Sequence, residues 1–323
     1  YALPPLSRKS DGLPTGAVSG FCSMLFKLLE ESRNDDSDNK PTHFAVIFDS
    51  ARKNFRNDIY SEYKANRTEA PEDLAPQFEY IRKSVKAFNL PSIELTNYEA
   101  DDLIATYAKK IIEAGAKVTV ISSDKDLMQL VSDKIRLYDP MKSKVLGEKE
   151  VIEKFGVKPN QVIDVQSLAG DSSDNIPGVP GIGIKTASEL INKYKTLDAL
   201  LKRAKEIPQN KRRETLLVNK DKALLSRQLV TLKKDVPVKN SIKEFKLKEI
   251  NKEKLYNFLR EMEFNRLLSS VISAYGEIEF SVKTNASIKE EKNQKISKKN
   301  YELIEKEEDI DKWLNEAEEN GEI

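Results

Sequence analysis

Cysteine and histidine are almost absent from this chain of 323 residues, which contains one of each, Cys22 and His43. A single cysteine forms no intramolecular disulfide, and the two residues are too few for the Cys and His ligand sets of zinc sites. Long apolar runs and a signal peptide are also lacking, so we expect a cytoplasmic protein with no membrane partner. Carboxylates remain as the only plentiful metal ligands.

Net charge is lacking too. Charged residues make up 33% of the chain, yet their signs nearly cancel to +1. The charges are therefore informative through their positions. Acidic residues gather in three short clusters at 99–102, 124–126 and 171–174, which contain Glu99, Asp101, Asp102, Asp124, Asp126, Asp171 and Asp174. Such groups repel one another unless cations hold them, and the cations that prefer oxygen ligands are hard ones such as Mg²⁺ and Mn²⁺.

Two apolar runs that end in an acid predict buried parallel strands. Residues 43–49 end at Asp49, and residues 117–124 end at Asp124. Helical spacing of apolar residues between them, with Gly115 as a stop, predicts a helix that starts near residue 101. The alternation of strand, helix and strand predicts an open α/β sheet, in which ligands bind beyond the carboxyl ends of the strands. Helix capping alone could account for any one acid pair, but not for acids on four segments at one edge.

The pattern becomes helical after residue 150, with helices expected at 159–169 and 184–194. Between them lies a hairpin, 175–183, that contains Gly178, Gly181 and Gly183 and is followed by Lys185. Bare glycine backbone before a helix N-terminus can approach a phosphate without reading sequence. An ordinary turn between helices is the alternative. Three glycines and two prolines are more than a plain turn requires, which favours the phosphate-binding interpretation. Basic residues also far outnumber acidic ones from 185 to 234.

Residues 52–67 interleave basic and aromatic side chains. On one continuous helix, a single face would carry Arg56, Tyr60, Tyr63, Lys64 and Arg67. Aromatic rings beside cations suit a single strand or a frayed DNA end. A solvated helix face is the alternative at this point.

In combination and order, the motifs of residues 1–284 resemble the 5′-nuclease (5′-3′ exonuclease) domain of bacterial DNA polymerase I, akin to phage 5′-nucleases and eukaryotic flap endonucleases. The resemblance rests on Phe48-Asp49, Phe55-Arg56, Tyr63-Lys-Ala-Asn-Arg67, Tyr98-Glu-Ala-Asp-Asp102, Ser123-Asp-Lys-Asp126 and the run Gly170–Gly183. It implies an open, mostly parallel sheet flanked by helices, of the PIN/5′-nuclease type, with a helical subdomain of the helix-hairpin-helix type.

The resemblance also implies roles for individual residues. Two Mg²⁺ or Mn²⁺ ions would be held, the first by Asp49, Glu99 and Asp101 with Asp102 close by, and the second by Asp124, Asp126, Asp171 and Asp174. Lys64 and Arg67 would act catalytically on the scissile phosphate. DNA would be bound by Arg56, Tyr63, Gly178, Gly181, Gly183 and Lys185, with K⁺ at the hairpin carbonyls.

We expect four regions along the chain. Residues 1–150 would form the nuclease core, with a helical arch at about 52–90, and residues 151–284 the DNA-binding subdomain. Residues 285–300 read as a linker, and 301–323 as the start of a proofreading-exonuclease-like domain. The parent protein, a monomer, would continue into that domain and a polymerase domain.

The resemblance implies removal of 5′ flaps and RNA primers in replication and repair, on DNA with a 5′ flap, a nick or an RNA primer. Family members begin with a buried strand whose terminal Asp is a ligand, and this chain is expected to start just after it. A DNA-binding module with an incomplete nuclease site therefore stays open as the alternative. The hairpin disfavours a minimal RNase, and the basic 185–234 segment disfavours a small-molecule phosphatase.

Overall fold

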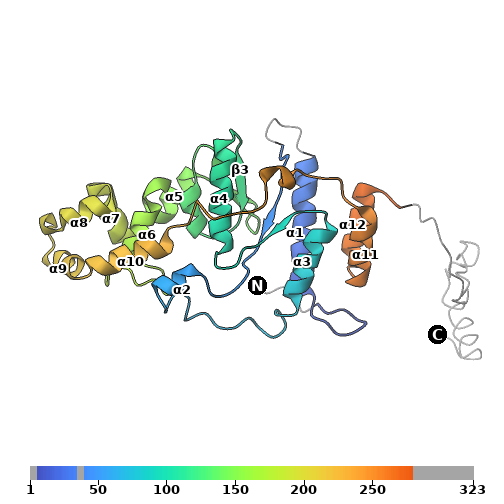
Figure 1. Ribbon diagram of the computed structural model, residues 1–323, viewed down its shortest axis with the longest axis horizontal. Coiled ribbons are helices and arrows are strands. Elements are labelled where there is room, and N and C mark those ends of the chain that lie inside the picture. Colours follow the sequence, from blue (N-terminus) through green and yellow to red (C-terminus); the bar gives the residue numbers. More distant parts are fainter. Residues whose placement is uncertain (1–5, 35–39, 279–323) are drawn as a thin grey trace, which may run out of the picture. The chain divides into compact units, whose positions relative to one another are not determined.

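The computed structural model describes residues 6–34 and 40–278. They belong to one unit, Tyr1–Ile278, so the predicted linker at 285–300 and the predicted domain start at 301–323 lie outside the described residues. The α-helices and strands, in chain order, are α1 Gly16–Arg33, β1 Val46–Ile47, α2 Phe55–Ile59, α3 Gln77–Ala87, β2 Ser92–Ile93, α4 Ala100–Glu113, β3 Val118–Ile121, β4 Ile135–Asp139, β5 Lys144–Leu146, α5 Glu148–Phe155, α6 Val162–Ala169, α7 Ile184–Tyr194, α8 Leu197–Lys202, α9 Asn210–Val218, α10 Lys220–Val230, α11 Lys252–Glu261 and α12 Asn265–Tyr275 (Figure 1). No helix in the described part of the chain has the length and apolar character needed to cross a membrane.

The strands form two small sheets. β1 pairs in parallel with β2, while β3 pairs in parallel with β4 and β4 pairs antiparallel with β5. The α/β architecture with mostly parallel pairing agrees with the sequence expectation. The two apolar runs that predicted strands nevertheless lie in different sheets. β1 forms its hydrogen bonds with the segment at 91–93, whereas β3 pairs with β4.

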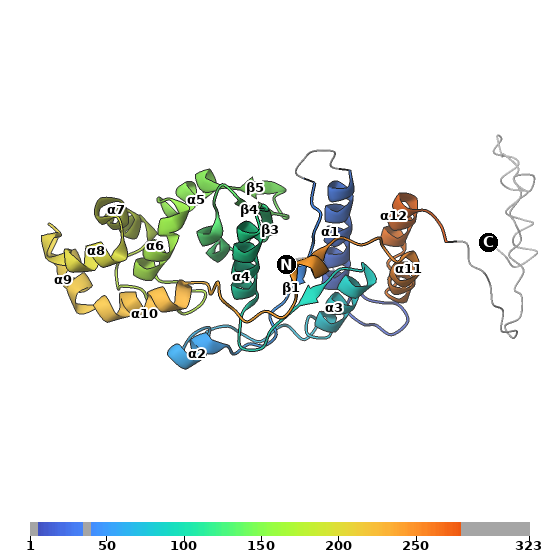
Figure 2. The ribbon, with the colours of Figure 1, turned by 45° about the horizontal axis from the view of Figure 1, so that its top comes forward.

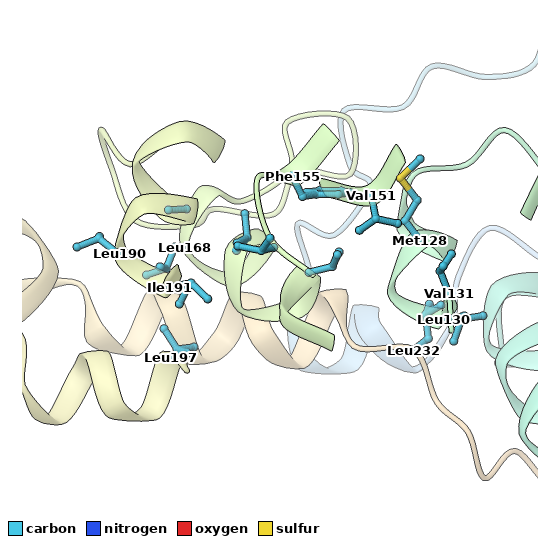
Figure 3. Packing of buried hydrophobic residues seen from close by; sticks show 14 of the residues in the cluster. Met128, Leu130, Val131, Val151, Phe155, Leu168, Leu190, Ile191, Leu197 and Leu232 are labelled. Atoms are coloured by element: carbon cyan, nitrogen blue, oxygen red, sulfur yellow. The ribbon is translucent and has the colours of Figure 1, made fainter. Parts of the chain in front are cut away.

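Two large apolar clusters hold the helices. One contains buried side chains of α1, α3, α11 and α12, which Figures 1 and 2 show side by side. The other joins the segment after β3 to α5 and to helices α6 to α10, through residues such as Met128, Val151, Phe155, Leu168 and Ile191 (Figure 3). Residues 252–275, expected in the DNA-binding subdomain, therefore pack with the N-terminal helices.

The predicted continuous helical face through residues 56–67 is wrong. α2 ends at Ile59, because Tyr60 adopts an extended conformation and Lys64 has a positive φ of 56°. Residues 61–66 form turns instead, and the next helix, α3, packs against α1. The basic and aromatic side chains of this segment therefore do not share one helical face, and each has different surroundings.

Candidate active site

The N-terminus of α4 presents three of the predicted acids. Glu99 is the N-cap residue, and Asp101 and Asp102 lie in the first turn. The Glu99 amide donates to Asp102 Oδ2 at 3.3 Å, and the Ala100 amide donates to Asp49 Oδ1 at 2.7 Å. Because a helix N-terminus carries partial positive charge, it stabilises acids gathered there.

Asp101 lies among the other acids. Burial raises its pKa well above the ordinary value, and the neighbouring charges of Asp124, Glu99, Asp126 and Asp49 raise it further. Carboxylates from three parts of the chain are therefore within electrostatic reach of one side chain. This crowding is the feature predicted from the sequence.

The turn after β3 carries Asp124 and Asp126. The Asp126 amide donates to Asp124 Oδ1 at 2.9 Å, and Gln166 Nε2 donates to Asp126 Oδ1 at 2.6 Å. Burial and the charge of Asp124 raise the pKa of Asp126 to about 6 despite the Gln166 hydrogen bond. With Asp101, two acids of the cluster have raised pKa values, caused first by burial and then by the like charges beside them.

A closed loop supplies the last two acids. Backbone hydrogen bonds between Asp171 and Ile176, at 2.8 and 3.0 Å, close the loop. Asp171 accepts from the Ser173 amide and hydroxyl and lies 2.6 Å from Lys125 Nζ. Burial would raise the pKa of Asp171, but the hydrogen bonds from Lys125 and Ser173 outweigh it, and the pKa is lowered.

Asp174, on the same loop, is buried beside the 60–67 segment. Arg67 Nη2 contacts its Oδ1 at 2.5 Å, and Lys64 Nζ lies 3.5 Å from its Oδ2. Lys64 also donates to Glu99. The backbone is fixed as well, since the Lys64 amide donates to the Asp174 carbonyl at 2.9 Å. The two predicted catalytic cations thus lie directly against the acidic cluster.

These groups surround a polar cavity of about 30 Å³. Its lining includes five of the predicted acids and both predicted catalytic cations, namely Glu99, Asp101, Asp124, Asp126, Asp174, Lys64 and Arg67. Carboxylate oxygens are the ligand type that hard divalent cations prefer. Within residues 6–34 and 40–278, however, no three acidic, His or Cys side chains lie close enough to hold a metal ion as they stand.

Arg56 and Asp102 do not occupy their predicted roles. The side chain of Arg56 is 1% exposed and that of Asp102 is 0% exposed, and they form a bidentate pair at 2.7 and 2.8 Å. Arg56 also donates to the carbonyls of Leu229 and Thr231, and Asp102 accepts from the Lys233 amide. The guanidinium of Arg56 and the oxygens of Asp102 are thus committed to partners inside the protein, and contact of Arg56 with DNA stays a prediction.

Tyr63, predicted to stack on DNA, is 4% exposed. Its ring packs with Ile176, Leu229 and Val230, and its hydroxyl donates to Glu99 at 3.1 Å. Burial and the nearby Glu99 charge raise the pKa of Tyr63, so the hydroxyl stays a donor. The buried Tyr63 hydroxyl thus contacts Glu99, and its stacking on DNA stays a prediction.

The glycines of the predicted hairpin divide into two kinds. A Cβ on Gly178 would lie 2.4 Å from the Gly170 nitrogen, so Gly178 is required for backbone packing against Gly170. Gly181 and Gly183 have nothing within 4 Å of a Cβ position, and Lys185 is also exposed. α7 begins there without a side-chain cap on its first amides. Gly181, Gly183 and Lys185 are therefore exposed, whereas Gly178 is buried.

Three residues that contact the acids of the site were not identified from the sequence. Lys125 pairs with Asp171, Gln166 holds Asp126, and Asn54 Nδ2 donates to Glu99 at 2.9 Å. Lys125 stands between two predicted ligands, which was a usable signal. Gln166 is a polar residue at a buried position of a helix, a second signal. For Asn54 the sequence offered no signal beyond its position before α2, where it serves as the N-cap.

Two family models match residues 1–253 of the chain. Residues 1–156 match the model of the 5'-3' exonuclease, N-terminal resolvase-like domain, and residues 157–253 match that of the 5'-3' exonuclease, C-terminal SAM fold. DNA polymerase I of Rhizobium leguminosarum is 56% identical over 85% of this chain, and DNA polymerase I of Bacillus subtilis is 39% identical over 83%. The chain spans only 27% and 30% of these two relatives.

A shorter relative matches over nearly its full length. The 5'-3' exonuclease of Aquifex aeolicus is 39% identical, with 84% of this chain and 90% of that protein covered. Among solved structures, the phage T5 D15 flap endonuclease in a complex with DNA and metal ions shares the fold at a TM-score of 0.57 and 21% identity, over 79% of this chain and 89% of its own. The catalytic core of Rad2 with DNA does so at a TM-score of 0.55 and 15% identity, over 80% and 85%. On the family models and the Aquifex relative together, this chain belongs to the 5'-3' exonuclease family.

Proposed function

We propose that this chain is the 5′-nuclease part of a DNA polymerase I, a hydrolase that cuts DNA phosphodiesters to remove 5′ flaps and RNA primers in replication and repair. One observation carries the proposal: acids from separate segments surround Asp101, and Lys64 and Arg67 face them across a small polar cavity. Family membership supports it. The parent protein would be a cytoplasmic monomer with proofreading-like and polymerase domains beyond this chain.

Five acids would hold two divalent ions, Mg²⁺ or Mn²⁺: Asp101, Asp124, Asp126, Asp49 and, once Lys64 leaves it, Glu99. Such ions supply positive charge at the attacking and leaving oxygens of a phosphoryl displacement. Asp171 and Asp174, which the resemblance assigned to the second ion, would join only when their present cationic partners leave. Asp102 would instead fix the start of α4 through Arg56 and the Lys233 amide.

The protein's own side chains have separate tasks in this proposal. Lys64 and Arg67 would stabilise negative charge that develops on the scissile phosphate. Tyr63 and Asn54 would orient Glu99, to which both donate hydrogen bonds. At a distance from the acids, Gly181, Gly183 and Lys185 would bind the duplex backbone, with K⁺ at the hairpin carbonyls.

The test is cleavage of a 5′-flap DNA by the full-length protein with Mg²⁺. We expect cutting near the flap junction that is abolished by a chelator and by Asp101→Asn. Lys158→Met is the matched control, since it removes one partner of an exposed ion pair with Glu148 away from the cavity. Binding of flap DNA without Mg²⁺-dependent cutting would instead support the alternative, a DNA-binding module with an incomplete nuclease site.

A further inference from the structure

Residues 229–233, here called the strap, continue from the C-terminal end of α10 and run past the elements that carry the acids. Leu229, Val230 and Leu232 are buried and line the polar cavity. Thr231 is extended, with φ −74° and ψ 119°. In extended chain the backbone polar groups of successive residues point to opposite sides, so the strap presents two rows of groups that need partners inside the protein.

Gln129 holds one side of the strap. It is 7% exposed and lies on the 3₁₀ turn Asp126–Leu130, which also carries Asp126. Its Nε2 donates to the Val230 carbonyl at 2.9 Å, and its Oε1 accepts from the Leu232 amide at 3.1 Å. The side-chain amide thus takes the position of a peptide group in a neighbouring strand. An apolar replacement would remove the hydrogen-bond partner of two buried backbone groups.

The other side of the strap is held by Arg56, which donates to the carbonyls of Leu229 and Thr231 at 2.8 and 3.2 Å. The same guanidinium forms the buried bidentate pair with Asp102. Asp102 in turn accepts from the Lys233 amide at 2.8 Å. The strap is therefore held between two side chains, and Asp102 is bonded to its far end.

Asp102 connects the strap to the acids at the start of α4. Its Oδ2 accepts from the amide of Glu99, the N-cap residue, at 3.3 Å. Asp101 is the preceding residue, and both Glu99 and Asp101 line the polar cavity. If the strap is loosened at Gln129, the pair of Arg56 and Asp102 can shift, and the first turn of α4 shifts with it.

We propose that Gln129 is a positioning residue of the nuclease site. By fixing the strap, it holds the pair of Arg56 and Asp102 in place. Through that pair it sets the direction in which Asp101 and Glu99 face the scissile phosphate. The inference rests on the proposed function and adds to it a residue outside the lining of the cavity. Misplacement by about 1 Å can slow a reaction about 100-fold, so Gln129 affects the rate of cutting and not the affinity for DNA.

Gln77 provides a matched control, because it is the same residue type at a similarly buried position. It is 5% exposed, and its amide also bonds to backbone groups through both atoms. Its Oε1 accepts from the Ala17 amide at 2.8 Å, and its Nε2 donates to the Asp73 carbonyl at 2.7 Å. Neither partner lines the polar cavity. Gln77→Met and Gln129→Met should therefore lower the urea midpoint to a similar degree, whereas only Gln129→Met should disturb the site.

The first measurement is cleavage of a 5′-flap DNA by the full-length protein with Mg²⁺, at a temperature where circular dichroism shows every variant to be folded. Gln129→Met should lower kcat about 10- to 100-fold, with KM and DNA affinity within about twofold of the wild type. Gln77→Met should keep the wild-type kcat. An equal loss of kcat in both variants, or an unchanged kcat in Gln129→Met, would overturn the inference.

The route through the buried pair is tested by combining Gln129→Met with Asp102→Asn, which keeps the shape of the carboxylate and removes its charge. If Gln129 acts through Asp102, the double variant should cut no more slowly than the slower single variant, because the second change finds the pair already released. Losses that multiply would mean that Gln129 acts by another route, which also contradicts the inference.

Amide hydrogen exchange of the full-length protein, followed by mass spectrometry, tests the same connection without cleavage. In Gln129→Met, the strap and residues 99–103 should both exchange about tenfold faster than in the wild type, whereas Gln77→Met should leave both unchanged. Faster exchange confined to the strap would sink the inference, because the disturbance would stop short of the acids. This measurement decides the inference even if the double variant does not fold. A wild-type protein that binds flap DNA and does not cut it would contradict the proposed function instead.

Discussion

Gly178 and Gly181 lie three residues apart, and the structure predicts different consequences for adding one methyl group to each. At Gly178, φ is +58°, and a Cβ would lie 2.4 Å from the Gly170 nitrogen and 2.6 Å from the Ala169 carbonyl carbon. Those neighbours are backbone atoms, which cannot swing aside. At Gly181, φ is +75° and nothing lies within 4 Å of the Cβ position.

The magnitudes follow from these two environments. A non-glycine residue in the left-handed region costs about 1–2 kcal/mol at either position. Overpacking against backbone adds about 1–3 kcal/mol at Gly178 alone. Gly178→Ala should therefore lower the free energy of unfolding by about 2–5 kcal/mol, and Gly181→Ala by no more than about 2 kcal/mol.

Urea unfolding followed by circular dichroism measures the difference, with the slope m checked for constancy between variants. Equal losses for the two alanine variants would refute the assignment of Gly178 to packing. A bulkier change, Gly181→Val, should impair cutting of long duplexes that reach the hairpin more than of short ones. Equal loss on both lengths would mean that the hairpin serves structure alone.

Three further predictions follow from single side chains. Arg56→Ala leaves Asp102 buried without its partner and should lower the free energy of unfolding by about 3–5 kcal/mol in urea denaturation, and a loss under about 1 kcal/mol would contradict the proposed structural role. Lys64→Ala should slow flap cleavage about 100-fold with little change in DNA affinity. Lys185→Ala should instead weaken DNA binding and reduce its salt dependence. If both variants change DNA binding alone, Lys64 is not part of the active site. Without metal, the pKa of Asp126 in the folded protein is raised to about 6, so the folded protein binds this proton more tightly than the unfolded chain. The resulting contribution to the free energy of unfolding is complete below about pH 4 and is lost as the pH rises through 6. In chelator-treated protein, Asp126→Asn should remove this pH dependence of the free energy of unfolding. If the variant and the wild type show the same dependence from pH 4 to 7, the raised pKa of Asp126 is contradicted.

The sequence determined the local features of this protein. Helical spacing and a stop at Gly115 predicted α4, and the acids at 99–102 predicted where it begins. The hairpin between α6 and α7 was also predicted from its glycines. Each of these features depends on residues within a few positions of one another, so that backbone preferences and capping are sufficient to specify them.

Only the tertiary structure decided which side chains face the cavity. Arg56 donates to the carbonyl of Leu229, which is 173 positions away in the chain, and this contact turns it inward although its spacing suggested a DNA-facing residue. Gly178 and Gly181 look alike in sequence, but only Gly178 meets the backbone of Gly170. The pairing of Asp171 with Lys125 and of Asp174 with Arg67 likewise depends on contacts between distant segments. Spacing along the chain fixes the local direction of a side chain, whereas its burial and its ionic partner depend on which remote segments pack against it.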